Sequence, residues 1–309
     1  MTLNKALLFL VAGMSMLPGC EDSFDPVFRD HMRDFVTGIA EYARDTDPGF
    51  IIIPQNGIEL VTENGEPGGT PAAAYLAAID GVGQEDLFFG YRQDNKATPE
   101  GETAYLLDFL TICSQQQKKV LVTDYCSSTS MVDASYARSA ENGFISFAAP
   151  DRELTLIPGY PDPVNGFNNN DILRLSDASN FLYLINPEQF EDRTSFIEAL
   201  SLSSYDLFIL DLFFDGVPLT LQEVESLKTK PQGGARLVIA YMSIGEAEDY
   251  RYYWDPDWTG DPPDWLLEEN PDWEGNYKVE YWSSDWQSEI FGSPGAYLDR
   301  LLAAGFDGA

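Results

Sequence analysis

The fold is decided by the stretch Leu237-Val-Ile-Ala-Tyr-Met-Ser-Ile-Gly-Glu-Ala-Glu-Asp-Tyr-Arg251. Its β-branched, apolar beginning predicts a buried strand, which ends at a glycine followed by two glutamates and an aspartate. A segment rich in Trp, Tyr, Asp and Pro comes next, and all six tryptophans of the chain fall within residues 254–286. Carboxylates at the end of a buried strand, beside flat aromatic faces, are what a carbohydrate-cleaving site requires.

Similar apolar runs recur along the chain. Continuous apolar runs, rather than strict alternation, indicate strands buried on both faces and hence a parallel sheet. Helical patterns separate several of these runs, as over residues 102–116, 194–202 and 219–227. The predicted strands cover residues 50–54, 87–91, 120–124, 144–148, 181–185, 207–211 and 237–241, with the beginning of an eighth at 306–309.

Eight strands alternating with helices predict an α/β fold of the (β/α)8 TIM-barrel type. The alternative is an open doubly wound sheet, but no G-x-G-x-x-G motif follows the first strand. Residues 306–309 contain only the entry to a strand, so we expect an incomplete last strand, an unclosed barrel edge and a C-terminally truncated chain. Residues 150–180 and 254–286 are predicted to be long loops, the second of which shapes the cleft.

The N-terminus has the pattern of an export signal. Lys5 precedes an apolar run over residues 6–16, and Leu17-Pro-Gly-Cys20 follows. A cysteine after Leu-x-Gly resembles a bacterial lipobox, in which Cys20 is acylated and anchors the protein to a membrane. Because Pro18 departs from the usual small residue, cleavage by an ordinary signal peptidase and secretion remain open. The expected divisions are a signal peptide over residues 1–20, a tether over 21–45 and the barrel domain over 46–309.

The charge of the chain limits its partners. Fifty-one acidic residues against eighteen basic ones give a net charge of −33. Such a field repels phosphates, which argues against nucleic acid as a ligand. It favours either a cationic ligand or simple solubility. Beyond the N-terminus, no segment reaches the roughly 18 apolar residues of a membrane span.

Several kinds of catalytic site are excluded by composition. The only histidine, His31, lies in the predicted tether, so no Ser-His-Asp or Cys-His triad is available. No C-x-x-C motif occurs, and we expect neither a metal site nor a cofactor. Cys113 and Cys126 could form a disulfide in an exported protein or remain two buried thiols. Catalysis must therefore rest on carboxylates, tyrosines or lysines.

Two carboxylates are predicted to carry the chemistry, because the site of a β/α barrel lies at the C-terminal ends of its strands. Asp211 ends a wholly apolar run, and an enclosed carboxylate has its ionised form disfavoured unless it is paired, as in a general acid. Glu246 follows a glycine directly after a strand end, where substrate can approach closely. The residues predicted to contact substrate are Tyr241, Glu248, Arg251, Trp254, Asp124 and Tyr91.

Structural roles remain open for some of these residues. Asp211 could fix a loop, and Glu248 could be a solvated charge that opens a helix. Arg251 is better explained as an ion-pair partner that orients the acids than as a substrate ligand. Trp265 and Trp273 could simply pack an irregular loop.

The motifs together resemble glycoside hydrolase family 114, whose members are usually labelled endo-α-1,4-polygalactosaminidase. The resemblance is most specific over residues 241–251 and spans roughly residue 50 onward. Its other motifs are Glu269-Asn-Pro-Asp-Trp273, Val279-Glu-Tyr-Trp282, Gly305-Phe-Asp-Gly308, Phe144-Ile-Ser-Phe-Ala-Ala149 and Asp124-Tyr-Cys126.

The resemblance implies a TIM barrel, catalysis by carboxylates and cleavage of α-1,4-linked galactosamine polymers. A partly deacetylated polymer of this kind is cationic, which agrees with the acidity of the chain. In that family an acidic residue after the strand matching residues 306–309 also lines the site, a position beyond Ala309.

Two functions of different classes follow. The first is an exported glycoside hydrolase in which Asp211 and Glu246 flank the scissile bond of a cationic or amino-sugar polysaccharide. The second is a surface glycan-binding lipoprotein that uses the same scaffold without catalysis, because a fold alone does not prove chemistry.

Overall fold

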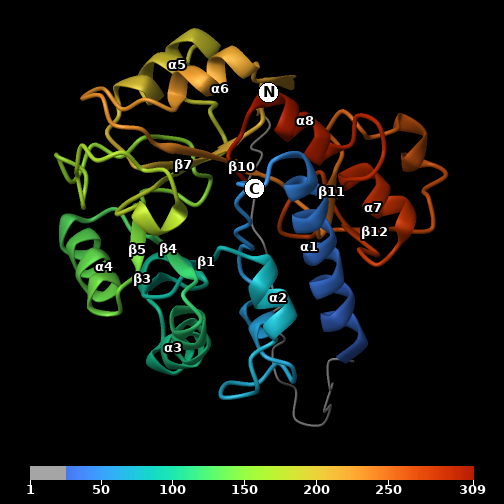
Figure 1. The fold of residues 1–309 in the computed structure, drawn as a ribbon, viewed down its shortest axis with the longest axis horizontal. Coiled ribbons are helices and arrows are strands. Elements are labelled where there is room, and N and C mark those ends of the chain that lie inside the picture. Colours follow the sequence, from blue (N-terminus) through green and yellow to red (C-terminus); the bar gives the residue numbers. More distant parts are fainter. Residues whose placement is uncertain (1–25) are drawn as a thin grey trace.

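The structure is a computed structural model and describes residues 26–309. Parallel strands run through its middle (Figure 1). They form two sheets, with strand orders β1-β4-β5 and β10-β7-β6. Every pairing within these two sheets is parallel. The strands are β1 (Gly81–Glu85), β4 (Lys119–Tyr125), β5 (Ile145–Ala149), β6 (Leu182–Leu184), β7 (Leu207–Asp211) and β10 (Leu237–Tyr241). The predicted α/β class with parallel sheets is therefore confirmed.

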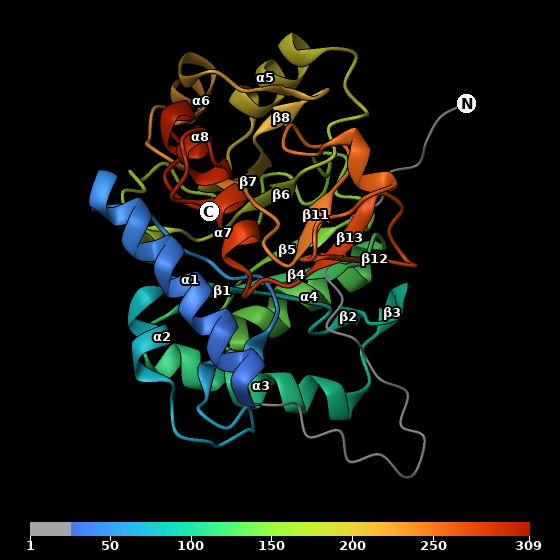
Figure 2. The same ribbon diagram turned by 90° about the vertical axis from the view of Figure 1, so that its right-hand side faces the viewer.

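Helices surround these sheets (Figures 1 and 2). In sequence order they are α1 (Pro26–Thr46), α2 (Ala73–Ala78), α3 (Glu100–Gln115), α4 (Thr129–Glu141), α5 (Arg193–Leu202), α6 (Leu221–Leu227), α7 (Ser284–Ile290) and α8 (Tyr297–Ala304). Helices α3 and α4 pack beside the first sheet, whereas α5 and α6 lie together over the second. Helix α6 begins with a capping box, in which the Thr220 side chain accepts from the Glu223 N–H.

Two further extended segments connect the sheets through backbone hydrogen bonds. Gln55 bridges to Gly83 of β1, and Ile51 bridges to Gly308, both in parallel orientation. Gly308 also bridges to Ile239 of β10. The segment around Gly308 therefore lies between the first extended segment and β10, and its backbone bonds to both. Our prediction of an exposed edge at this point is wrong, because both neighbouring backbones are hydrogen-bonded there.

The second strand does not cover residues 87–91 as predicted; β1 precedes them. Strand β1 is buried along its length although it contains two glycines and few apolar residues. Gly81 is needed for space, since a Cβ there would lie 2.8 Å from the Lys119 carbonyl oxygen, whereas one on Gly83 would displace the end of the Gln55 side chain. A search for apolar runs does not detect a buried strand that is made largely of glycine and polar residues.

Short antiparallel strands extend from the ends of the parallel ones. Those after β1 and β7 are two hairpins, and those after β10 form a small sheet of order β11-β13-β12. The strands are β2 (Phe89–Gly90), β3 (Gln93–Ala97), β8 (Phe213–Phe214), β9 (Val217–Pro218), β11 (Glu246–Glu248), β12 (Leu266–Glu269) and β13 (Asn276–Val279). Part of the predicted loop over residues 254–286 is therefore ordered sheet. Residues 150–180 are irregular as predicted, apart from one short 3-10 turn, η2 (Leu175–Asp177).

Helix α1 replaces most of the predicted tether over residues 21–45. Its residues Phe35, Val36, Ile39 and Ala43 are buried, and their helical spacing forms one apolar face against the body of the protein. Within residues 26–309 no helix is long and apolar enough to cross a membrane. The predicted signal peptide, Cys20 and residues 21–25 lie outside the described residues.

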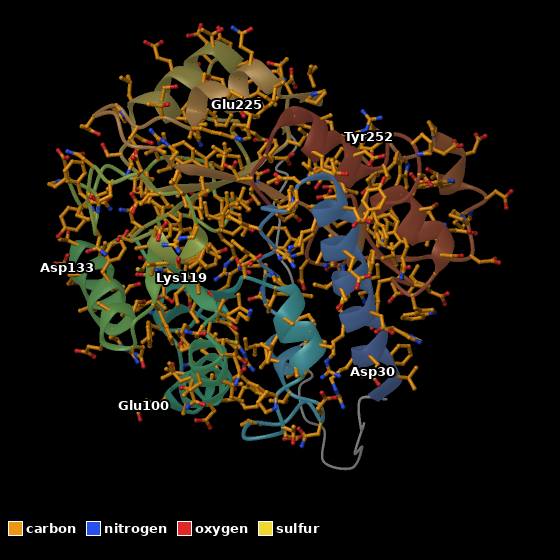
Figure 3. The ribbon with its side chains drawn as sticks, viewed as in Figure 1. Asp30, Glu100, Lys119, Asp133, Glu225 and Tyr252 are labelled. Atoms are coloured by element: carbon orange, nitrogen blue, oxygen red, sulfur yellow. The ribbon has the colours of Figure 1, made fainter. Side chains whose placement is uncertain are left out.

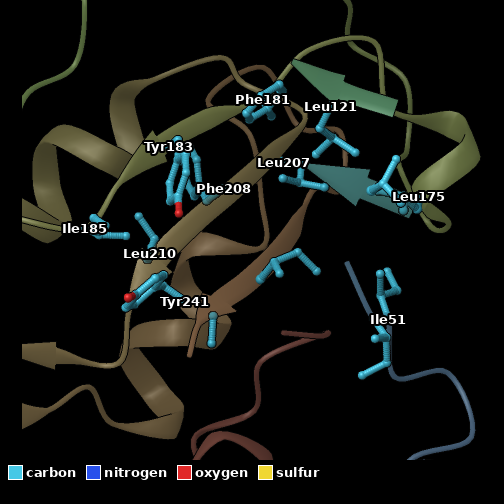
Figure 4. Packing of buried hydrophobic residues seen from close by; sticks show 14 of the residues in the cluster. Ile51, Leu121, Leu175, Phe181, Tyr183, Ile185, Leu207, Phe208, Leu210 and Tyr241 are labelled. Carbon is cyan, nitrogen blue, oxygen red and sulfur yellow. The ribbon is translucent and has the colours of Figure 1, made fainter. Parts of the chain in front are cut away.

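The core lies between the sheets and the helices that cover them. Figure 4 shows Leu121 of β4 in this core together with Phe181 and Leu207, and each of these side chains is almost fully buried. Burying a large apolar side chain contributes about 1.5–3 kcal/mol, so this continuous cluster is the main source of stability. In contrast, acidic side chains such as Asp30, Glu100, Asp133 and Glu225 lie at the outside (Figure 3).

Candidate active site

A pocket of about 590 Å³ opens at the C-terminal end of β7. It is formed by the loop after β6, the β8–β9 hairpin and the turn after β11. Its lining residues are Ile185, Asn186, Pro187, Glu188, Phe190, Glu191, Asp211, Phe213, Phe214, Asp215, Gly216, Tyr250, Arg251 and Tyr252. Carboxylates and aromatic rings therefore line it together, at the strand end where a catalytic site was predicted.

Asp211 and Arg251 form a bidentate ion pair in this pocket. Arg251 Nη1 donates to Asp211 Oδ1 at 2.9 Å, and Nη2 donates to Oδ2 at 2.8 Å. The Phe213 N–H also donates to Oδ1, at 2.8 Å. The side chain of Asp211 retains 13% of its accessible surface. Asp211 is therefore not an unpaired enclosed carboxylate, which was the reason to consider it as a general acid.

Glu248 lies beneath this ion pair and is fully buried. Its carboxylate accepts from Arg251 Nε and, at 2.7 Å, from the Tyr250 hydroxyl. Its own N–H donates to the Tyr253 hydroxyl at 3.0 Å. Burial is the main cause that raises the pKa of Tyr250, so this phenol stays protonated and donates. Glu248 is therefore not a solvated charge at a helix start; it fixes Arg251, and Arg251 fixes Asp211.

Glu246 lies on the same face of β11 as Glu248, two residues away. Two amides hold its half-buried carboxylate: Asn270 Nδ2 donates to Oε1 at 2.7 Å and Asn276 Nδ2 donates to Oε2 at 3.1 Å. Burial raises the pKa of Glu246, and Glu248 raises it further, while the two amides and Lys278 act in the opposite direction. Burial thus favours the protonated form of Glu246.

A chain of contacts joins the two predicted catalytic residues, although Glu246 does not line the pocket. Asn276 contacts Tyr250, whose hydroxyl lies 3.3 Å from Asn276 Oδ1. From there the contacts continue through Glu248 and Arg251 to Asp211. Hydrogen bonds and ion pairs thus connect Asp211, Glu246, Glu248 and Arg251 in one network.

Four predicted substrate-contacting residues lie elsewhere. Asp124 is fully buried and accepts from the N–H groups of Phe88 and Phe89 at 2.8 and 3.1 Å, so it anchors the segment after β1. Tyr91 lies beyond that anchor, in the β2–β3 hairpin, with the Arg92 guanidinium 5.2 Å from its ring centre. Neither residue lines the pocket that contains Asp211.

Tyr241 lines a different cavity, of about 240 Å³, on the side of β10 that faces α1 and the segment after residue 50. Its lining contains no carboxylate and is mostly aliphatic, with Gln55 and Asn56 as amide-bearing residues. This cavity lacks the acid groups that bond cleavage by general acid catalysis requires. Burial is the first cause that raises the pKa of Tyr241 well above its ordinary range.

The tryptophans mostly pack against one another and do not line the pocket. The ring of Trp254 lies 5.2 Å from that of Trp258 and 4.8 Å from that of Tyr277. Trp265 and Trp286 are buried, with ring centres 5.0 Å apart. The packing interpretation of Trp265 and Trp273 agrees with their burial. The aromatic side chains of the pocket are phenylalanines and tyrosines instead, namely Phe190, Phe213, Phe214, Tyr250 and Tyr252.

Several residues of this site were missed in the sequence. Asn270 directly follows β12, and Asn276 is the first residue of β13. Both lie 20 to 30 residues after β11 in the sequence, in a segment that folds back on β11. Glu188, Glu191 and Asp215 line the pocket from loops after strands, and only their position after predicted strands could have indicated them. Both cysteines that were left open, Cys113 and Cys126, are free and buried.

Comparison with known proteins finds similarity over the C-terminal part of the chain. Residues 199–309 match the family model described as glycoside-hydrolase family GH114. An uncharacterized protein of Methanocaldococcus jannaschii is 38% identical over 144 residues, which are 46% of this chain and 39% of the relative. Uncharacterized proteins of Thermotoga maritima and Deinococcus radiodurans are 38% and 43% identical over 109 and 113 residues. These matches cover 35% and 36% of this chain, and 32% and 34% of the relatives.

The chain thus spans between about a third and two fifths of the length of the curated relatives it matches. The family match begins before β7 and includes Asp211, the whole Glu246–Arg251 run and the β11-β13-β12 sheet. The resemblance inferred from the motifs is confirmed there: over residues 199–309 this chain is similar to glycoside hydrolase family 114.

Proposed function

We propose that this protein is a glycoside hydrolase in which Asp211 and Glu246 supply the two carboxylates of the reaction. The observation that carries the proposal is the position of Asp211, a paired carboxylate that remains accessible in a pocket of about 590 Å³. The match of residues 199–309 to a glycoside hydrolase family supports it.

The two carboxylates differ in the way that glycoside cleavage needs. Burial raises the pKa of Glu246, which favours the protonated form of a general acid. Asp211 is held by a guanidinium and serves as the second carboxyl group, either as nucleophile or as the base that activates water. For the two groups to act on one bond, Glu246 must reach the pocket through a change in its amide contacts or through substrate that extends toward it.

A (β/α)8 barrel is the finer architecture we propose for the scaffold. The parallel pairings of β1-β4-β5 and β10-β7-β6, together with the bridges at Ile51, Gln55 and Gly308, support it. In such a barrel the pocket at the end of β7 lies on the face where catalytic residues gather.

The substrate we propose is a cationic or amino-sugar polysaccharide. Asp211, Glu188, Glu191 and Asp215 line the pocket with Arg251 as the only basic residue among its lining, and Arg251 is already paired with two carboxylates. An excess of negative charge attracts protonated amino groups. Phe190, Phe214 and Tyr252 offer apolar surface to sugar rings. The α-1,4-linked galactosamine polymer implied by the family resemblance has this chemistry.

Export remains part of the proposal. A lipid anchor at Cys20, or secretion after signal cleavage, would place the protein where it meets an extracellular polysaccharide. A Cys20→Ala protein should lose lipid labelling and appear in the soluble fraction, while an unchanged membrane fraction would contradict the anchor.

The second candidate function is glycan binding without cleavage. Arg251 occupies both oxygens of Asp211, and this observation favours binding, because a carboxylate that is fully paired is a poor nucleophile. Under this function the pocket holds a sugar but no bond breaks.

The test measures new reducing ends from a panel of α-linked galactosamine and N-acetylgalactosamine polymers. We expect cleavage by the wild-type protein and loss of at least 100-fold in Asp211→Asn and in Glu246→Gln, the size of a general acid–base contribution. The matched control is Glu141→Gln, at the exposed end of α4, which should retain activity. Binding without any cleavage would support the second function, and full activity in both site variants would refute the assigned pair.

A further inference from the structure

Two asparagine amides hold Glu246 in similar ways but have different surroundings. Each donates to one oxygen of the carboxylate, Asn270 at 2.7 Å and Asn276 at 3.1 Å. Both asparagines are buried, with 5% and 2% of their surface exposed. Asn270 Oδ1 accepts from the Asp272 N–H and so belongs to the turn before β13. Asn276 Oδ1 instead faces the Tyr250 hydroxyl at 3.3 Å.

The register of the small sheet explains why Asn276 reaches both groups. Asn276 pairs with Glu248, and β11 and β13 are antiparallel. Side chains opposite each other on one face lie about 5 Å apart at Cβ, and diagonal neighbours about 7–8 Å apart. Asn276 is therefore the direct neighbour of Glu248 and the diagonal neighbour of Glu246. Its amide can donate to one carboxylate while its carbonyl oxygen accepts from the phenol bound to the other.

We infer that Asn276 is a positioning residue that couples Glu246 to the Asp211–Arg251 pair through Tyr250 and Glu248. The coupling itself is a property of the folded protein, and its value for catalysis rests on the proposed function. Asn270 positions the same carboxylate without this connection, because its other contact ends in a local turn.

The direction of the effect follows from hydrogen bonding. Tyr250 has one hydroxyl proton, which it donates chiefly to Glu248 at 2.7 Å and shares with Oδ1 of Asn276 at 3.3 Å. The shared contact polarises the Asn276 amide, and a polarised amide is a stronger donor to Glu246. A stronger donor stabilises the ionised carboxylate and lowers its pKa, opposing the burial that raises it. The charged groups that face Glu246 are Glu248 on its own strand and Lys278 on β13, and both residues are kept in the variants below. Tyr250→Phe also removes the phenol donor from Glu248, a loss that is common to both backgrounds of the cycle below.

The experiment is a titration of the Glu246 side-chain carboxyl by carbon NMR in the full chain, assigned by the signal lost in Glu246→Gln. Asn276→Ala and Asn270→Ala should each raise the Glu246 pKa by about one unit, because each removes one donor to a charged group. Tyr250→Phe should raise it by roughly 10–30% of that amount, the cooperative strengthening expected for one bond in a chain.

The decisive comparison is a double-mutant cycle. The Tyr250→Phe shift should disappear in the Asn276→Ala background and persist in the Asn270→Ala background, which is the matched control. Equal Tyr250→Phe shifts in both backgrounds would overturn the inference, since coupling would then run through space and not through Asn276. If Asn276→Ala does not fold, Asn276→Leu replaces it, because it has a similar size and neither a donor nor an acceptor. It should raise the Glu246 pKa and abolish the Tyr250→Phe effect in the same way.

This titration is independent of catalysis. A protein that cleaves no glycan would refute the proposed function, yet the cycle would still decide the coupling. If the protein is active, the same variants should move the alkaline limb of the kcat/KM profile upward by the shift seen in the titration, with little change in KM.

Discussion

The ion pair between Lys230 and Asp206 gives a prediction about stability that is independent of the active site. Both side chains are fully buried, and Lys230 Nζ lies 2.7 Å from Asp206 Oδ1. Asp206 directly precedes β7, so the pair lies at the opposite end of this strand from Asp211. Asp206 Oδ2 has two further donors, Asn168 Nδ2 and the Ser179 N–H, each at 2.8 Å. The change we consider is Lys230→Met, which keeps most of the side-chain volume.

The expected cost is about 3 kcal/mol of the free energy of unfolding. Removing one partner of a buried ion pair costs about 3–5 kcal/mol, because the other charge is left uncompensated. The lower end applies here, since Oδ2 of Asp206 keeps its two donors and only Oδ1 loses its Lys230 contact. Met replaces the aliphatic part of the lysine, so little is added for a cavity.

Equilibrium unfolding in urea, followed by tryptophan fluorescence, measures this loss. The matched control is Lys278→Met, which removes an exposed pair with Glu268, 49% and 70% accessible, and should cost under about 1 kcal/mol. The double variant Lys230→Met with Asp206→Asn should recover part of the loss, because no buried charge then remains unpaired. If Lys230→Met costs no more than Lys278→Met, the buried pair does not stabilise this protein as reasoned.

Three further predictions concern other sites. Gly308→Ala should destabilise the protein by about 1–3 kcal/mol, because the new Cβ would lie 2.4 Å from a backbone oxygen. Gly101→Ala, which has open space around it in a helix, should be neutral or stabilising. Urea unfolding of both variants measures this, and equal effects would contradict it. Burial raises the pKa of the Cys113 and Cys126 thiols to about 12, so neither should react with a disulfide reagent at neutral pH until the protein unfolds; rapid reaction in the native state would contradict their burial. Because the pKa of Glu246 is raised and its protonated form is the proposed active one, glycan cleavage should persist above the pH range of an ordinary glutamate and fall as pH rises through the raised value; an alkaline limb below that range, in a kcat/KM profile, would argue against Glu246 as the acid.

Much of the scaffold could be predicted from apolar runs and helix signals. The runs at residues 120–124, 144–148, 207–211 and 237–241 coincide with β4, β5, β7 and β10 to within a residue or two. These strands are buried on both sides, so their sequence is continuously apolar. Strand β1 was missed because two of its five residues are glycines and only Val82 is apolar, so it contains no apolar run.

Helix α1 failed for a different reason. Its buried residues are interrupted by charged ones at helical spacing, and its position after a signal-like segment favoured a tether. The helical spacing of the apolar residues is visible in the sequence, but the many charged residues around them favour a polar linker. An amphipathic helix has the same composition as a polar linker with a few apolar residues, and only their spacing separates the two.

At the candidate site, local sequence predicted the acids but not their partners. Asp211 and Arg251 were proposed from strand ends, and their pairing joins positions 40 residues apart. The two amides on Glu246 come from strands that fold back on β11, and strands of three or four residues leave almost no pattern. Tryptophans were expected to face a sugar because of their chemistry, yet their size makes them effective packing for an irregular sheet.

The bridge between Ile51 and Gly308 has a consequence for the order in which the protein assembles. These two residues pair although they stand roughly 260 positions apart in the chain. At a synthesis rate of about 5–20 residues per second, the first segment waits roughly 13–50 s on the ribosome before its partner exists. Until then the backbone N–H and C=O groups on one edge of the Ile51 segment and on one edge of β10 have no partner. Such open edges promote association between strands of different molecules. We therefore expect newly made chains to be most prone to association through these two edges before residues 307–309 have joined them.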